Sequence, residues 1–209
     1  HAQQKISITS EYQGHVFHLS TRSPFGFIKI VGMNSQGLFA SSQIMLPEEP
    51  PPVTRLPEHI SAAIFHQMVL SRFTKLDQVI SFLNQRQVIQ VDGLSLHNLV
   101  ADRFGDALVV EVGEAKNHIT SIHNGFIVMT NFPNHQYALK PFEDIGNNGV
   151  TRYNIAHAFI QNNFQTFDIE KGFALLRRVK NQSEIYPTRC SLIFVPHAGE
   201  VYICLENNF

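Results

Sequence analysis

Cysteine is scarce in this sequence, since the 209 residues contain only Cys190 and Cys204. Their wide spacing, without a CxxC pair, provides neither a disulfide framework nor a zinc site. The compartment therefore stays open between the cytoplasm, the periplasm and secretion. His15 and His18 lie three apart in an expected strand and would face opposite sides, so they are not expected to chelate together. We expect no metal and no cofactor.

An excess of charge and long apolar runs are absent as well. Sixteen basic residues against seventeen acidic ones leave a formal charge of −1, so nothing draws the chain electrostatically toward nucleic acid. The longest apolar runs, ALVVEV and FIVM, are far shorter than the roughly 20 residues of a membrane helix. The polar opening HAQQK does not read as a signal peptide. Neither nucleic acid nor a membrane is an expected partner.

The apolar content that is present is enough for one core. With 44% hydrophobic residues, a single domain over residues 1–209 is expected. Strands are predicted where β-branched and aromatic residues gather between turn residues. These segments are Ile6–Thr9, Gly14–Ser20, Phe25–Val31, Gly37–Met45, Leu96–Arg103, Ala107–Gly113, His118–Ile122, Gly125–Thr130, Arg189–Val195 and Glu200–Leu205.

Helical spacing of apolar residues predicts four helices. One starts at Glu58 with Pro57 in its first turn, and the next starts near Thr74, which would cap it. The other two are expected at Thr151–Gln161 and at Ile169–Val179, the second of them capped by Asp168. Because strands and helices come in separate blocks, the pattern favours an α+β fold with antiparallel sheets.

The stretch Gly105–Asn131 is expected to deliver one polar residue to the end of a strand. Asn131 closes an apolar run and is followed at once by Phe-Pro, at a position where chemistry is often mounted. On local sequence alone, Asn131 is more simply an Asx turn, and Arg152 a surface charge near a helix start. Asn34 is expected to be a turn residue favoured for its tolerance of left-handed backbone angles. Asp102 and Glu111 are expected to be turn and strand-face residues, and Cys190 a small buried one.

Five sequence blocks carry a family resemblance. They are GMNSQGL (Gly32–Leu38), SLHNLVADRFGDALVVEV (Ser95–Val112), GFIVMTNFP (Gly125–Pro133), TRYNIA (Thr151–Ala156) and the C-terminal TRCSLIFVPHAGEVYICLEN. In this order they resemble the choloylglycine hydrolase family, which includes bile salt hydrolases, penicillin V acylases and related acyltransferases. The resemblance implies the N-terminal-nucleophile fold, an αββα sandwich of two antiparallel sheets between helical layers.

The resemblance also implies a chemistry. In that family a cysteine at the mature N-terminus attacks a linear amide, and its own α-amine serves as the base. Asn131 matches the residue that donates to the oxyanion, and Arg152 matches an arginine of the active-site charge network. Gln43 falls near a further site position that carries Asn or Tyr in the family, and it would contact substrate.

The acyl group of such a substrate is expected to be apolar. The pocket walls would be the loops Pro47–Pro57 and Phe132–Gly149, and the second loop brings aromatic side chains. These are Phe132, Tyr137 and Phe142. The expected partner is therefore a small amide with an apolar acyl group.

The front of the chain departs from the family. It starts with His1, and residues 1–23 contain no match to the opening cysteine strand. The nucleophile is therefore expected outside these residues, on a preceding segment or on a separately processed chain. The alternative is a truncated, catalytically inactive relative that binds an acyl or sterol-like ligand or a partner subunit. The absent strand would leave a sheet edge open, which favours pairing with a second copy.

Overall fold

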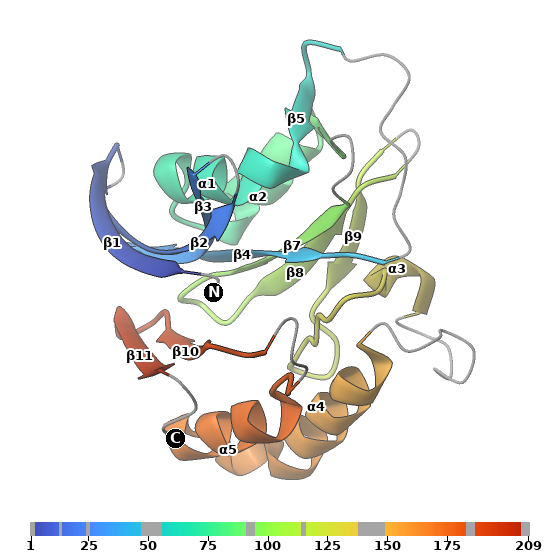
Figure 1. Cartoon of the computed structure of the whole chain (residues 1–209). Coiled ribbons are helices and arrows are strands. Elements are labelled where there is room, and N and C mark those ends of the chain that lie inside the picture. The colour runs from blue at the N-terminus through green and yellow to red at the C-terminus, as the bar shows by residue number, and fades with distance from the viewer. Residues whose placement is uncertain are drawn as a thin grey trace.

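A seven-stranded antiparallel sheet organises the molecule (Figure 1). The computed structural model describes residues 3–12, 14–23, 26–46, 56–90, 95–113, 116–137, 149–182 and 187–205. The sheet has the order β1-β2-β3-β4-β7-β8-β9. Its strands are β1 (Gln4–Glu11), β2 (Gly14–Ser23), β3 (Gly26–Asn34), β4 (Phe39–Ile44), β7 (Leu96–Ala101), β8 (Ala107–Glu111) and β9 (His118–Ser121). The strands expected in these places are confirmed.

β3 and β4 pair as an antiparallel hairpin, and its turn differs from expectation at Asn34. The left-handed residue of this turn is Gly37, with φ +80°. Among the described residues, Asn124 is the only non-glycine with positive φ, so Asn34 ends β3 with ordinary backbone. Asn34 is also buried, with 1% of its surface exposed. Its place in the turn therefore reflects its side-chain partners and not a special backbone angle.

Two helices, α1 (Ala62–Arg72) and α2 (Leu76–Leu83), cover one face of the main sheet. The first helix starts later than predicted, because the short strand β5 (His59–Ser61) precedes it and pairs in parallel with β6 (Gln87–Ile89). Ser61 caps α1 by accepting a hydrogen bond from the Ala63 amide at 3.3 Å. The cap of α2 is Lys75, one residue beyond Thr74. Pro57 and Thr74 therefore do not have the roles predicted for them.

The main core lies between these helices and the sheet. The sheet contributes Val16, Leu38, Ala40, Val100, Leu108 and Val110, and the helices contribute Phe65, Val69, Leu70, Leu76 and Val79. Along α2, the buried positions Leu76, Val79 and Leu83 recur at helical spacing, as the sequence predicts.

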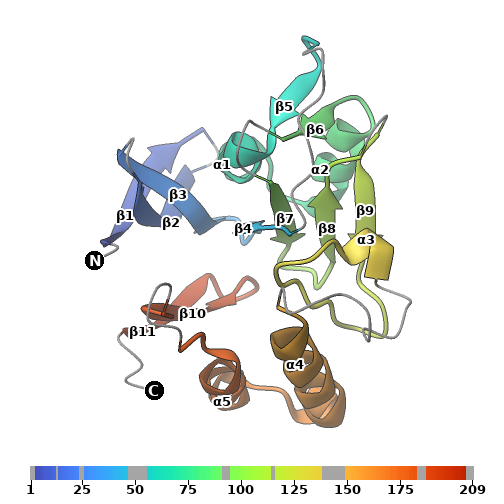
Figure 2. The same ribbon diagram turned by 45° about the vertical axis from the view of Figure 1, so that its right-hand side comes forward.

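The second face of the sheet is covered by a hairpin and then by helices (Figures 1 and 2). The hairpin is β10 (Cys190–Val195) with β11 (Glu200–Leu205), and the helices are α4 (Val150–Asn163) and α5 (Ile169–Val179). Phe194 of β10 packs against Phe39 of the main sheet, with ring centroids 4.8 Å apart. Asp168 caps α5 as predicted, accepting from the Lys171 amide at 2.8 Å. The layers thus follow the order helix, sheet, sheet, helix, which confirms the αββα architecture.

The segment Gly125–Thr130 does not form the predicted strand. Near it the structure has only an isolated bridge between His123 and Phe126. Two of its carbonyl groups are bound by side chains instead of a strand ladder: Asn134 donates to Val128 O at 2.7 Å and His97 to Thr130 O at 2.6 Å. The apolar composition alone suggested a strand, but these carbonyl groups accept hydrogen bonds from side chains.

Candidate functional site

Asn131 lies where the end of β4, the extended segment before it and the start of α4 meet. Its Nδ2 donates to the carbonyl of Ile44 at 2.7 Å, and its Oδ1 accepts from Arg152 Nη2 at 2.5 Å. A carbonyl only accepts and a guanidinium only donates, so these partners fix which end of the amide is which. Within the described residues Nδ2 makes one hydrogen bond, which leaves its second hydrogen for a ligand. The structure thus brings the two predicted site residues Asn131 and Arg152 into contact.

The first turn of α4 lies close to Asn131, and a glycine at its start permits this contact. Gly149 precedes the helix with φ +88°. A Cβ at Gly149 would lie 3.0 Å from the backbone nitrogen of Asn131 and 3.1 Å from Thr130 Cβ. Glycine therefore lets the first helical turn sit against Thr130–Asn131, and this turn carries the half-buried Arg152. One of the five guanidinium N–H groups is used on Asn131, so Arg152 has further donors to offer.

His97 and Glu111 form a buried pair that contacts the backbone next to Asn131. Both side chains have 0% exposure, and His97 Nδ1 lies 3.1 Å from Glu111 Oε1. The second ring nitrogen of His97 contacts Thr130 O at 2.6 Å. Glu111 also accepts from the backbone amides of Asn134 at 2.6 Å and His135 at 2.7 Å. The pair therefore contacts the chain on both sides of Asn131.

The environment of Glu111 favours its ionised form. Burial raises the pKa of Glu111, but the hydrogen bonds from His97 and from the His135 and Asn134 amides outweigh it, so the pKa is lowered overall. A further contact comes from His135 Nδ1 at 3.0 Å. The His135 ring stacks on His118, with centroids 4.0 Å apart, and burial, followed by the charge of His135, lowers the pKa of His118.

Sequence reasoning missed the part played by His97 and Glu111. The prediction that Glu111 is a strand-face residue is correct as far as it goes, because Glu111 ends β8. The signal that was available is chemical. A histidine and a carboxylate inside two largely apolar strands are costly to bury unless they are paired.

The other predicted site residues are less closely associated with Asn131. Gln43 lies opposite His97 in the β4–β7 pairing and is exposed, one residue before the Ile44 carbonyl that binds Asn131. Phe132 has 1% exposure and packs in a second core cluster with Val128, Tyr153, Ala156 and Leu175. The prediction that Phe132 lines a pocket wall is therefore wrong, since its ring fills the core beneath α4. Tyr137 ends the short helix α3 (Asn134–Tyr137), and Phe142 and most of both predicted wall loops lie outside the described residues.

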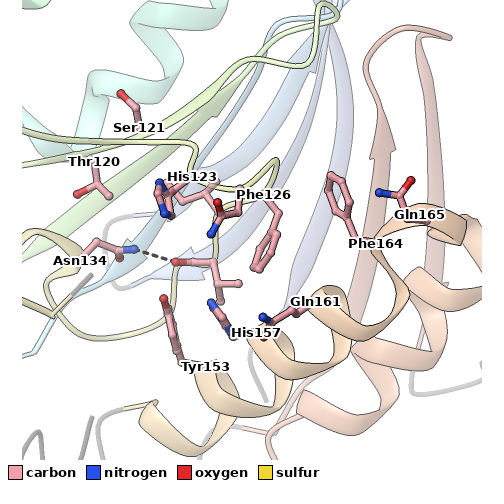
Figure 3. Close-up of a pocket in the computed structure, with 13 residues that line it drawn as sticks. Thr120, Ser121, His123, Phe126, Asn134, Tyr153, His157, Gln161, Phe164 and Gln165 are labelled. Carbon is pink, nitrogen blue, oxygen red and sulfur yellow. Dashed lines mark hydrogen bonds between the residues drawn. The ribbon is translucent and has the colours of Figure 1, made fainter. Parts of the chain in front are cut away.

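A pocket of ≈ 340 Å³ opens beside this site, between residues 120–128 and α4 (Figure 3). Tyr153 and His157 lie one turn apart on α4 and face the pocket with Phe126 and Phe164. The His157 ring contacts Phe126 at 5.1 Å and Tyr153 at 5.9 Å between centroids. Burial raises the pKa of Tyr153, which therefore stays neutral here. The pocket combines the rings of Phe126 and Phe164 with many polar side chains, among them Asn134, His157 and Gln161.

The described parts of the chain contain no group of three or more His, Cys, Asp and Glu side chains arranged to hold a metal ion. His18 is buried and His15 exposed, as their spacing predicts. Cys190 is half-buried and Cys204 buried, and both are free thiols; burial, and then Cys204, raise the pKa of Cys190. No helix in the described ranges is long and apolar enough to cross a membrane.

Comparison with known proteins identifies related chains. The family model described as "Acyl-coenzyme A:6-aminopenicillanic acid acyl-transferase" matches residues 2–209. A search of curated protein sequences found no match. A mutant of the conjugated bile acid hydrolase from Clostridium perfringens has a TM-score of 0.73 at 15% identity, covering 99% of this chain and 82% of that chain. A second variant of that enzyme gives 0.72 at 15% identity, with 98% and 82% covered.

Penicillin V acylase from Agrobacterium tumefaciens is similar too, with a TM-score of 0.67 at 17% identity, 96% of this chain and 72% of that chain being covered. At such identities the structural likeness concerns the fold. Together with the family match, it confirms the resemblance carried by the five sequence blocks.

Proposed function

The chain belongs to the acyl-coenzyme A:6-aminopenicillanic acid acyl-transferase family, and we propose that it cleaves non-peptide linear amides with a cysteine nucleophile that lies outside these 209 residues. Asn131 is the oxyanion donor, and Arg152 holds and polarises it. The observation that carries this proposal is the fixed orientation of the Asn131 amide, between the Ile44 carbonyl and the Arg152 guanidinium.

The proposed reaction has two steps. A thiolate attacks the amide carbon, a C–S bond forms, and the carbonyl electrons move to oxygen, where the second N–H of Asn131 donates to the oxyanion. The oxyanion collapses, the C–N bond breaks, and the amine leaves with the proton that the α-amine of the nucleophilic cysteine took from its thiol. Water or an acceptor amine then attacks the thioester and releases the thiolate. Arg152 raises the donor strength of Nδ2, because its cationic hydrogen bond draws electron density toward Oδ1.

Removing the Asn131 amide tests the oxyanion assignment. In Asn131→Ala we expect kcat to fall by about 10²-fold or more, measured as amine release from a phenoxyacetyl amide and from a taurine-conjugated bile acid. Asn154→Ala is the matched control, since Asn154 is an exposed asparagine on α4. An Asn131→Ala enzyme with wild-type kcat on both substrates contradicts the assignment.

The nucleophile is tested separately on the protein isolated from its natural source. Its intact mass, followed by alkylation with iodoacetamide, reports whether an N-terminal cysteine is present and needed. We expect one labelled N-terminal thiol and loss of turnover. If turnover persists after complete alkylation, the cysteine mechanism is wrong.

Binding without turnover is a second candidate function, and the pocket of Figure 3, lined by aromatic and polar side chains, favours it. If the protein only binds its ligand, isothermal titration calorimetry should detect binding of the same two amides to the natural-source protein, and no amine should be released. Measurable release rules it out.

A further inference from the structure

The hydrogen-bond partners of His97 determine which protons it carries. Its Nε2 lies 2.6 Å from a backbone carbonyl, which only accepts. Its Nδ1 lies 3.1 Å from Glu111 Oε1, and an ionised carboxylate also only accepts. With Glu111 ionised, both ring nitrogens of His97 face acceptors, and this arrangement suits the imidazolium form of the ring.

The partners of Glu111 support the same protonation state. Its two oxygens face two backbone N–H donors, of Asn134 and His135, and two imidazole rings, of His97 and His135. A carboxylate has about four lone-pair sites, so every one of them is used. The lowered pKa of Glu111 agrees with hydrogen bonds made to its ionised form.

The pair spans the residues around the candidate oxyanion donor. His97 contacts the Thr130 carbonyl, immediately before Asn131. Glu111 contacts the amides of Asn134 and His135, just after Pro133. Asn131–Pro133 is thus fixed at both ends by one charged unit, and Asn131 is bound from a third direction by Arg152.

We propose that His97 and Glu111 form a buried ion pair that positions Asn131, so that the proposed amide cleavage requires the imidazolium form of His97. Both are positioning residues, because they act through the Thr130–His135 backbone. The inference rests on the proposed function for its catalytic consequence. The groups that face the pair in the described residues are His135 on α3, His118 stacked on it from β9, Gln43 on β4, and Arg152 of α4 through Asn131.

Deprotonation of His97 then has a defined effect. A neutral ring keeps one hydrogen, so either the Thr130 carbonyl or Glu111 loses its donor. Turnover is expected to fall on the alkaline side as this proton leaves, through kcat more than KM, because a displaced Asn131 weakens the transition state more than substrate binding.

The first test needs no activity. Imidazole ¹⁵N NMR of the full protein near pH 7 is expected to show a proton on both nitrogens of His97, and the Asn131 side-chain amide signal is expected to shift in Glu111→Gln. One bare nitrogen on His97, or an Asn131 amide that does not move, overturns the proposal whether or not the protein proves to be an amide hydrolase.

The second test uses turnover. Glu111→Gln places an NH₂ group against at least one backbone N–H, and His97→Gln can serve only one of its two acceptors. We expect each to lower kcat about 10- to 100-fold with KM little changed, and His97→Gln to lose the alkaline limb of the pH profile. His66→Gln is the control, since His66 is equally buried on the other face of the sheet. An alkaline limb that persists in His97→Gln, or equal losses in His66→Gln, contradicts the positioning role.

If Asn131→Ala leaves turnover unchanged, the proposed function fails while the NMR result still decides the ion pair. The two failures are therefore distinguishable.

Discussion

Asn34 holds two layers of the molecule together through one side chain. Its Oδ1 accepts from the amides of Gln36 at 3.1 Å and Leu38 at 3.0 Å. Its Nδ2 donates to the carbonyls of Leu70 at 3.1 Å and Phe73 at 2.8 Å. This uses the full capacity of the amide, and it ties the β3–β4 turn to the end of α1.

Replacing Asn34 with alanine is therefore expected to be costly. Four backbone groups lose their partner in a buried place, and we expect the free energy of unfolding to fall by about 3 kcal/mol. Urea denaturation followed by circular dichroism measures this. Gln36→Ala is the control, because its side chain is exposed in the same turn and should change stability by less than about 0.5 kcal/mol. Equal effects of the two changes would remove the side-chain explanation.

Single residues were predictable where their role is local or carried by the family pattern. Asn131 and Arg152 were placed together by that pattern, and Asp168 by the preference of helix starts for an acceptor. Asn34 and His97 were not, because their partners lie far along the chain: Phe73 for Asn34 and Thr130 for His97. Phe132 was misplaced because its type suits a pocket wall and a core equally well.

At the scale of elements, the junction between α4 and the preceding segment sets the position of the candidate site. Gly149 combines a left-handed backbone with close contact to Thr130 and Asn131. Gly199 in the β10–β11 turn also has positive φ, at +71°, but a Cβ there would meet nothing within 4 Å. Comparing substitutions at the two glycines therefore separates the destabilisation caused by a left-handed backbone angle from the destabilisation caused by steric contact with Thr130 and Asn131.

Alanine at these two glycines is expected to have different effects. Gly199→Ala should lower the free energy of unfolding by about 1–2 kcal/mol, the cost of a left-handed residue. Gly149→Ala should cost more, because its Cβ also pushes on Asn131, and should lower kcat as well. Urea denaturation and amide turnover measure the two effects. If both variants lose the same stability and neither loses activity, the contact at Gly149 has no influence on the site.

Elements were predictable when their own pattern decides their hydrogen bonds. The α5 boundaries Ile169–Val179 agree with the prediction, since cap and apolar spacing are both local. The segment Gly125–Thr130 has the composition of a strand, but its carbonyls are bound by His97 and Asn134. The apolar run after Glu58 begins with β5 because that strand pairs with β6, which lies beyond α2. Such tertiary choices override local propensity.

For the whole molecule, the separated blocks of strands and helices correctly predicted an α+β sandwich. They did not predict which strands are neighbours. The pairing of β4 with β7 places Gln43 opposite His97, and it leaves two helices and their connections outside the ladder. The pairing of β4 with β7 depends on tertiary packing, because α1 and α2 lie between them in sequence. Both helices pack on one face of the sheet, where the main core lies.

The face of the sheet that α1 covers buries two histidines whose pKa values are lowered. His18 of β2 and His66 of α1 have 1% and 0% exposure, and His66 Nδ1 lies 2.9 Å from Ser42 Oγ. Burial, and then the charge of Lys29, lowers the pKa of His18 from 6.5 to about 4. Burial, followed by His18 and Lys29, lowers the pKa of His66 from 6.5 to about 4. Both side chains are therefore neutral in the folded protein near pH 7.

This burial makes the fold sensitive to acid between pH 6.5 and about 4. In that window His18 and His66 are protonated in the unfolded chain but neutral in the folded protein. The free energy of unfolding therefore falls as the pH falls, by up to about 1.4 kcal/mol per pH unit for each histidine. The contribution of Glu111, whose folded pKa is lowered from 4.5, is lost only below that value. Urea denaturation from pH 7 to 4.5 should therefore show a shallower slope in His66→Gln and an unchanged slope in His15→Gln, whose histidine is exposed. Identical slopes in all three proteins would mean that His66 is not titrating with unfolding.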